Sequence, residues 1–232
     1  MARPADPHAR SALIAAARRE FRRSGIQRAR IEDITQACGL SKGAFYLHFA
    51  SKEALFREVV AGLQTHFDEV RERREQAYLE LISAVPKSKM NAIVTRLADV
   101  DAEGDRRLLE LLWEWRDVAD VLLRGSQGTE FEGVMWLMLD AEAQRVAEQC
   151  GALGRAKLVR ADVPAELVGM MIVGTYLMVA RRIALATQKP DFEPWVRSLQ
   201  SLIAEGIAAK GSPAVAITRA AAKRVNGRKK TA

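Results

Sequence analysis

Cysteine, aromatic residues and long apolar runs are all scarce in this chain of 232 residues. The two cysteines, Cys38 and Cys150, are too few for a disulfide framework and fit a reducing compartment. The three histidines are scattered, so we expect no metal site, and no motif indicates a cofactor. Aromatics make up 6% of the residues and alternating Val, Ile or Thr runs are rare, so the composition predicts helices and no sheet.

Signals for a membrane or for export are also missing. The longest uncharged stretch, Leu167 to Ala180, is closed by Arg181 and Arg182, and is shorter than the roughly 18 apolar residues of a membrane span. Residues 1–10 have neither an apolar core nor a cleavage site of the kind a secretion signal needs. We therefore expect a cytoplasmic protein that has no membrane partner.

The charges that are present are unevenly distributed. Residues 1–52 hold 10 Lys or Arg and 4 Asp or Glu, a net charge of +6, and residues 210–232 hold 7 basic and no acidic residues. Residues 53–209 hold 19 basic and 25 acidic residues, a net charge of −6. Basic ends around an acidic centre indicate that the termini meet a polyanion, unless the pattern is only a solvated surface.

The N-terminal region has the pattern of a helix-turn-helix. Apolar residues recur on one face of residues 7–24, and Gly25 is expected to end that helix. A short helix over 31–38 is followed by the turn residue Gly39, and Ser41 is placed to cap a second short helix over 42–49. Phe45 and Phe49 are expected in the core. Cys38 is expected to be a small residue at the helix crossing, with a redox switch as the less favoured interpretation.

The rest of the chain has helical periodicity with breaks at glycine and proline. The expected helices cover residues 52–79, 89–100, 106–123, 130–149, 164–186 and 192–209, with breaks at 86–88, Gly104, 125–128, 151–154 and 188–190. We therefore expect three parts: a helix-turn-helix region over 1–52, a larger helical domain over 53–209, and a disordered basic tail over 210–232.

The string ITQACGLSKGAFYLHFASKEALF at residues 34–56 resembles the DNA-binding signature of the tetracycline-repressor (TetR) family, and the likeness extends over about residues 10–59. The turn glycine, the N-cap serine, the aromatic core and the Lys-Glu start of the next helix all fall in one register. The resemblance implies an all-α fold with a three-helix head, a larger ligand domain, and a homodimer whose last two long helices form a four-helix bundle. It also implies a sequence-specific regulator and not an enzyme, by family default a repressor that a small-molecule effector releases from operator DNA. The methionines and tryptophans of the larger domain favour a hydrophobic effector.

The expected DNA contacts lie on and around the second helix of the motif. N-terminal residues of a recognition helix reach base edges, and the flanking residues reach phosphates. Lys42 can donate to guanine and the Ala44 methyl can touch thymine. The resemblance adds phosphate contacts from Tyr46 and His48, although ordinary surface placement would also explain both. The full expected set is Arg30, Lys42, Gly43, Ala44, Tyr46, Leu47, His48 and Lys52.

Three positions depart from the family pattern. Arg30 stands where a Thr or Ser usually caps the first helix of the motif, and it can reach a phosphate but cannot cap. Thr35 stands where alanine is usual. Leu47 is apolar at a position that can face DNA, which leaves its contact open. The operator sequence cannot be read from these residues.

Two further surfaces are predicted in the larger domain. The candidate effector-binding residues are Trp113, Trp115, Met135, Trp136, Met138 and Tyr176, each of which could equally be plain core. The segment 164–186 is apolar nearly all round and should therefore cover something beyond its own domain. The candidate dimer residues are Met170, Gly174, Met178, Leu199 and Leu202.

Two other classes of function remain open at this point. A nucleoid-type protein would use the basic ends to bind DNA without regard to sequence. An all-helical enzyme would use Glu110, Glu114 and Asp117 as paired carboxylates on one helix face, but the sequence has no accompanying nucleophile, metal or phosphate-binding motif.

Overall fold

The computed structural model describes residues 7–84, 90–155, 160 and 162–207, and it contains no strand within these ranges. The helices in chain order are α1 (Pro7–Arg28), α2 (Ile31–Ala37), α3 (Lys42–His48), α4 (Lys52–Ala84), α5 (Met90–Glu114), α6 (Arg116–Asp120), the π-helical turn η2 (Val121–Gly125), α7 (Val134–Arg155), α8 (Ala165–Ala184) and α9 (Glu193–Ile207). The expected all-α fold, with a small helical head and a larger helical body, is confirmed.

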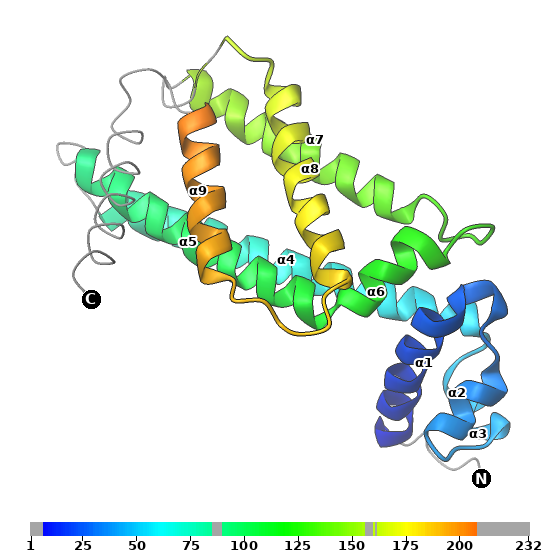
Figure 1. Cartoon of the computed structure of the whole chain (residues 1–232). Coiled ribbons are helices and arrows are strands. Elements are labelled where there is room, and N and C mark those ends of the chain that lie inside the picture. Colours follow the sequence, from blue (N-terminus) through cyan, green and yellow to red (C-terminus); the bar gives the residue numbers. More distant parts are fainter. Residues whose placement is uncertain (1–6, 85–89, 156–159, 161, 208–232) are drawn as a thin grey trace.

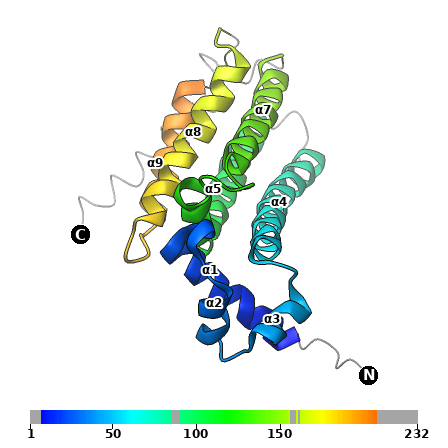
Figure 2. The ribbon, with the colours of Figure 1, turned by 90° about the vertical axis from the view of Figure 1, so that its right-hand side faces the viewer.

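The head, formed by α1 to α3, lies at one end of the molecule (Figure 1). The long helix α4 leads from the head into the body and packs along α5 (Figure 1). Helices α7 and α8 pack side by side, and α9 crosses over α5 (Figures 1 and 2). The body is therefore built from the five long helices α4, α5, α7, α8 and α9.

The core of the head continues into the body. Phe21, Phe45 and Phe56 are each at most 1% exposed, and the rings of Phe21 and Phe56 meet edge to face at 5.1 Å. On its other side Phe56 meets the ring of Phe131 at 4.8 Å, and Val118 belongs to the same buried cluster. Apolar burial is the main stabilising term in folding, so this shared core joins the head firmly to the α6 region.

The four glycines predicted to interrupt helices behave in two ways. Gly25 has the positive φ of 72° expected of a helix stop, but the chain only kinks there and the helix resumes to Arg28. The predicted break at Gly104 is wrong, because α5 runs through it without interruption. Gly151 and Gly154 also lie inside a helix, since α7 extends to Arg155. Helix-breaking tendency is a weak local preference, and packing overrides it in these places.

The expected single helix over 106–123 is instead divided. Trp115 has non-helical dihedrals (φ −107°, ψ 16°), so α5 ends at Glu114 and the short α6 begins at Arg116. The chain then widens into the π-helical turn η2, a geometry that is rare and often marks a functional position. Helix α7 starts at Val134 and not at Glu130. The predicted break at 86–88 and the predicted basic tail at 210–232 lie outside the described residues. The last described helix, α9, covers Glu193–Ile207.

Candidate nucleic-acid interface and body surfaces

The turn between α2 and α3 follows from a few residues. Gly39 has φ 69°, a left-handed conformation that residues with a Cβ rarely adopt, and the Leu40 amide donates to the Thr35 carbonyl at 2.9 Å. The Thr35 hydroxyl is buried and donates to the Glu32 carbonyl at 3.0 Å. Ser41 caps α3 by accepting from the Ala44 amide at 3.1 Å, as predicted.

Helix α3 separates its core face from its outer face. Phe45 is 0% exposed and Phe49, which follows the helix, is 4% exposed, which confirms their predicted core placement. Tyr46 and Leu47 are exposed by 57% and 66%. Burial of the phenylalanines fixes the roll of α3, so its outward side chains are held on a rigid base.

The other predicted DNA-contact residues on α3 also lie on or near this outer side. Lys42 and Gly43 are exposed, and Ala44 and His48 are half-buried. A Cβ at Gly43 would meet only the Ser41 Oγ, at 3.6 Å, so the protein fold itself does not require glycine there. Close approach of the backbone to another molecule is a reason for glycine at this point.

Lys42 is paired within the head. Its ammonium forms an ion pair with the Glu32 carboxylate of α2, and this hydrogen bond lowers the pKa of Glu32 below its ordinary value. The pair is open to solvent, with side-chain exposures of 53% and 44%. Exposed pairs contribute little energy, so Lys42 can exchange Glu32 for another acceptor.

Arg30 and Lys52 flank the motif. Arg30 precedes α2 with extended dihedrals and makes no capping hydrogen bond, as expected, and it is exposed. Lys52 begins α4, and its ammonium donates to the carbonyls of Gln27 (2.7 Å) and Ala29 (2.9 Å). Lys52 therefore ties α4 to the end of α1, whether or not it also reaches a phosphate.

The six candidate effector-binding residues have different surroundings, although Trp115 and Met135 pack against the same buried cluster. Trp113 is stacked under the Arg116 guanidinium at 3.9 Å, and Trp115 lies between Arg18 (4.4 Å) and the His66 ring (5.2 Å). The other four are spread over α7 and α8: Met135 packs on the core of the head, Trp136 is 59% exposed, Met138 is half-buried, and Tyr176 belongs to a polar cluster inside the body.

That interior polar cluster joins four helices, and its members are Arg74 and Tyr78 (α4), Asp101 and Asp105 (α5), Tyr176 (α8) and Gln200 (α9). The Arg74 Nη2 donates to Asp105 Oδ1 at 2.8 Å, Tyr78 donates to Asp101, and Gln200 donates to the other oxygen of Asp105. Asp105 is 1% exposed. Burial raises the pKa values of Tyr78, Asp101 and Tyr176, so both phenols stay neutral and donate.

Sequence reasoning missed this cluster, although one signal was available. A Cβ at Gly104 would lie 2.0 Å from the Arg74 Nε, so glycine provides the space that admits the guanidinium. A glycine inside an amphipathic helix costs about 1 kcal/mol relative to alanine and often has a packing reason. The same glycine had instead predicted a helix break.

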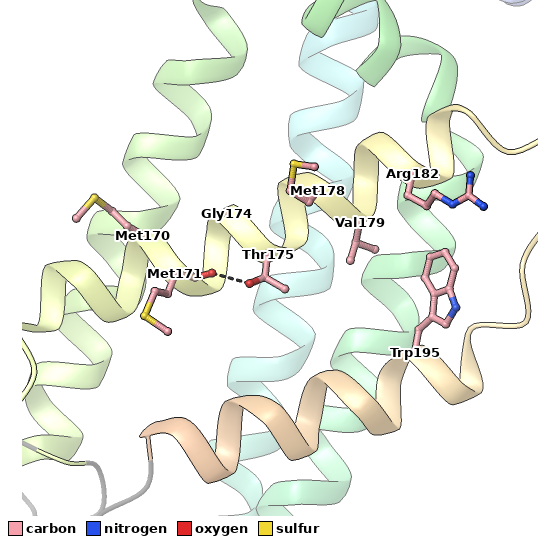
Figure 3. Close-up of a pocket in the computed structure, with 8 residues that line it drawn as sticks. All are labelled: Met170, Met171, Gly174, Thr175, Met178, Val179, Arg182 and Trp195. Atoms are coloured by element: carbon pink, nitrogen blue, oxygen red, sulfur yellow. Dashed lines mark hydrogen bonds between the residues drawn. The ribbon is translucent and has the colours of Figure 1, made fainter.

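The outer face of α8 and α9 carries an apolar groove (Figure 3). It is lined by Met170, Met171, Gly174, Thr175, Met178, Val179 and Arg182 of α8 and by Trp195 of α9. Met170, Met178 and Leu202, three of the predicted dimer residues, are exposed by 57%, 57% and 72%. Gly174 lines the groove with open space around it, whereas Leu199 is only 7% exposed and packs within its own chain.

Helix α8 is also long and apolar enough, by length and composition alone, to cross a membrane, and 28% of its apolar stretch is buried within the protein. This is weak grounds for a span, because an interface helix of a soluble protein has the same properties. In the described ranges, no group of three or more His, Cys, Asp or Glu residues is arranged to hold a metal ion.

Comparison with known proteins agrees with this architecture. The family described as "Bacterial regulatory proteins, tetR family" matches residues 13–59, which cover the helix-turn-helix. The HTH-type transcriptional regulator YerO of Bacillus subtilis is 57% identical over 37 residues, which cover 16% of this chain but only 13% of YerO. The regulator YdgC of the same organism is 27% identical over 181 residues, covering 71% of this chain and 91% of YdgC.

A solved structure extends the likeness to the whole fold. The complex of SmeT with triclosan aligns with a TM-score of 0.61 at 18% identity, covering 88% of this chain and 93% of SmeT. SmeT is the repressor of a multidrug efflux pump of Stenotrophomonas maltophilia. At this identity the likeness concerns the fold alone: a helix-turn-helix head on a helical body.

Proposed function

Because the chain belongs to the TetR family of DNA-binding transcriptional regulators, we propose that it is a repressor that binds operator DNA as a homodimer and releases it on binding a small hydrophobic effector. The observation that carries the DNA-binding part is the division of α3 into a buried aromatic face and an exposed face with Lys42, Gly43 and Tyr46. A two-turn helix of this kind fits the major groove.

The residues that contact DNA divide into two kinds. Lys42, Gly43 and Ala44, at the start of α3, face base edges, and Leu47 adds an apolar contact. Tyr46 and His48, with Arg30 and Lys52 beside the helix, hold phosphates and set the register of the head on the duplex. Lys42 leaves Glu32 when it donates to a base, a small cost for an exposed pair.

The homodimer is formed through the outer face of α8 and α9. Met170, Met171 and Met178 are exposed there and line the groove, and Leu202 of α9 is exposed as well. An isologous interface places the two heads in twofold symmetry, which matches a palindromic operator. Leu199 supports this face from inside its own protomer.

The proposal that a small hydrophobic effector binds in the body rests on family membership and on the apolar residues of the body. SmeT is solved with triclosan, a relative's ligand that supports a small apolar effector here. The effector binds in the body. Met138 lies on α7 and Tyr176 on α8, two helices that pack against each other, whereas Trp113 lies on α5. The protein acts in the cytoplasm and needs no cofactor.

The contacts of the carboxylates in the enzyme alternative favour a structural role for them. Glu110 forms an ion pair with Lys189 at 2.5 Å, and Asp117 is held by Arg18, so two of the three carboxylates have separate cationic partners. The nucleoid alternative differs from the proposal in specificity, because a regulator discriminates its site from random DNA by about a thousandfold or more.

One experiment tests the proposal. The wild-type protein is incubated with a random duplex pool, bound DNA is amplified over several rounds, and the recovered sequences are compared. We expect one inverted repeat, bound about a thousandfold more tightly than unselected duplex. Lys42→Ala should change the recovered sequence, whereas Tyr46→Phe should weaken binding to all duplexes alike. Lys189→Ala, which removes an equal charge from the body, should behave as wild type.

Recovery of no common sequence, with equal affinity for all duplexes, would favour the nucleoid alternative. If Lys42→Ala recovers the same repeat as wild type, the assignment of base contacts to the start of α3 is wrong.

A further inference from the structure

Arg18 of α1 reaches out of the head into the joint between α5 and α6. Its guanidinium makes two hydrogen bonds to the Asp117 carboxylate, at 2.8 and 2.6 Å, and a third to the Glu114 carbonyl at 2.8 Å. It also lies over the Trp115 ring, 4.4 Å from the centroid. One side chain of the head therefore contacts three successive parts of the body's interrupted helix.

This arrangement depends on the interruption itself. The dihedrals of Trp115 break the helix between α5 and α6, and α6 has no side-chain cap. A break of this kind leaves backbone carbonyls without helical partners, and Arg18 satisfies that of Glu114. The side chains of Arg18 and Asp117 are 23% and 18% exposed, so water screens the pair only partly.

A second arginine of α1 continues the contact toward the proposed dimer helix. Arg22, one turn after Arg18, donates to the carbonyl of Ala184, the last residue of α8, at 3.2 Å. Its Nε also lies 4.0 Å from Asp120 of α6. Helix α1 thus touches the end of the helix whose outer face forms the apolar groove.

The backbones of α1 and η2 also approach each other closely. A Cβ at Gly25 would lie 3.2 Å from the Gly125 carbonyl oxygen, so α1 and the end of η2 approach each other closely at this pair of glycines. Arg18, Arg22 and Gly25 fall on successive turns of α1, and each meets the segment 114–125 or the end of α8. Among these contacts, the bidentate pair of Arg18 with Asp117 constrains both the distance and the orientation of α1 relative to α6.

We propose that Arg18 is a positioning residue that fixes each head relative to the dimer core and so sets the spacing of operator half-sites that the protein accepts. This inference rests on the proposed function, because spacing has meaning only for a dimer on a two-part operator. A bidentate guanidinium over an aromatic ring holds both distance and orientation. Without this contact each head stays folded and competent to bind DNA, but its orientation can vary by a small tilt about the shared apolar core.

The test uses a spacing series. The inverted repeat recovered by the wild type is resynthesised with one or two base pairs inserted between its halves, each of which moves one half-site by about 3.4 Å and rotates it by about 35°. For the wild type, two inserted pairs should lower affinity about 100-fold, because the second head no longer reaches its site. For Arg18→Gln the same insertion should cost less than about tenfold, with weaker binding at the original spacing.

Three variants separate positioning from charge and from folding. Arg18→Lys keeps the charge but loses the bidentate geometry, and Asp117→Asn alters the partner without changing the head, so both should relax the spacing as Arg18→Gln does. Arg19→Gln removes the same charge from an exposed position on α1 and should keep the wild-type spacing penalty. If Arg18→Gln fails to fold by circular dichroism, Arg18→Lys and Asp117→Asn carry the test.

Each outcome decides the matter. The inference is overturned if folded Arg18→Lys and Asp117→Asn lose as much affinity as wild type does when base pairs are inserted. It is also overturned if wild type recovers a repeat but binds it equally well at every spacing. The proposed sequence-specific binding would remain valid after either result. A wild type that recovers no sequence would overturn the proposed function itself, and the inference with it.

Discussion

The head and the body of this protein distribute polar and apolar residues in opposite ways. The head buries phenylalanines and places Lys42 and Tyr46 outside. The body buries Asp105 beside Arg74 and exposes the methionines of α8. A head with a buried apolar core and a polar surface is stable in water by itself, whereas a large exposed apolar face marks a surface that another molecule covers. The contrast supports the proposal that the head is complete within one chain, whereas the exposed apolar face of the body is covered by a second copy.

The largest effect is expected from the head's core. Phe45→Ala should lower the free energy of unfolding by about 3–5 kcal/mol, because it leaves a cavity beside Phe49 in the core of the head. Urea unfolding followed by circular dichroism measures it. Tyr46→Ala, on the exposed side of α3, should change stability by no more than about 0.5 kcal/mol. If the body of the Phe45→Ala protein unfolds at the same denaturant concentration as in wild type, head and body do not share one core, and the two regions are more independent than proposed.

The next largest effect concerns the outer face of the body. Met178→Arg or Leu202→Arg should give a monomer, because each forces an unpartnered charge into an apolar interface. Operator affinity should then fall by about 100-fold, since each head binds alone. Sedimentation at about micromolar protein decides between dimer and monomer. Leu79→Arg changes an equally apolar, 60% exposed residue on α4 and should leave the dimer intact.

Leu199 is a poor probe of the same interface, although the sequence placed it there. It is only 7% exposed within its own protomer, so a charge at this position would disturb the fold as well as any dimer. If Met178→Arg and Leu202→Arg both stay dimeric, the groove of α8 and α9 is not the interface, and the comparison with the head loses its explanation.

A moderate effect is expected inside the body. Gly104→Ala should destabilise by about 1–3 kcal/mol despite the better helix propensity of alanine, because the new methyl displaces Arg74 from the buried Asp105. Chemical denaturation measures the change. In an Asp105→Asn background the same substitution should cost less, since no buried charge is left unpaired. Equal costs in both backgrounds would show that the cluster does not depend on this glycine.

The smallest effect is a dependence on pH. Burial raises the pKa of Asp101, so the folded state holds its proton more tightly than the unfolded state does. This contribution to stability is fully present below the ordinary carboxyl pKa of 3.8, which applies to the unfolded chain, and it is lost as pH rises through the pKa of the folded state. Asp101→Asn, which stays neutral, should therefore gain stability relative to wild type as pH rises from acid to neutral. Unfolding curves at several pH values test this, and a constant difference would contradict it.

The head could be predicted closely because its signals are local. Ser41, Gly39 and the spacing of Phe45 and Phe49 each act on their immediate neighbours, and the structure places all four as expected. The exact division of the chain at residue 52 remains a prediction, and the apolar core crosses that point through Leu55 to Leu63. A core shared by distant segments leaves no mark in the sequence of either one.

The candidate sites in the body were harder to predict for a related reason. Trp113 and Trp115 are two residues apart in sequence, yet one stacks on Arg116 and the other on Arg18, 97 positions earlier than Trp115. Apolar and aromatic composition indicated a ligand domain but could not say which side chains share a space. The role of a glycine within a helix was also ambiguous from sequence. Gly25 allows a kink in its helix, whereas Gly104 makes room for the side chain of Arg74.

The sequence by itself determined the helical class, the helix-turn-helix and the basic and apolar faces, because periodicity, capping and charge are properties of neighbouring residues. Only the tertiary structure decided that Arg74 enters the body beside Gly104, that Lys52 binds the end of α1, and that Arg18 joins the head to the α5–α6 joint. These contacts link segments from different helices. Their partners are selected by packing and by the need to pair buried polar groups, which no single segment encodes.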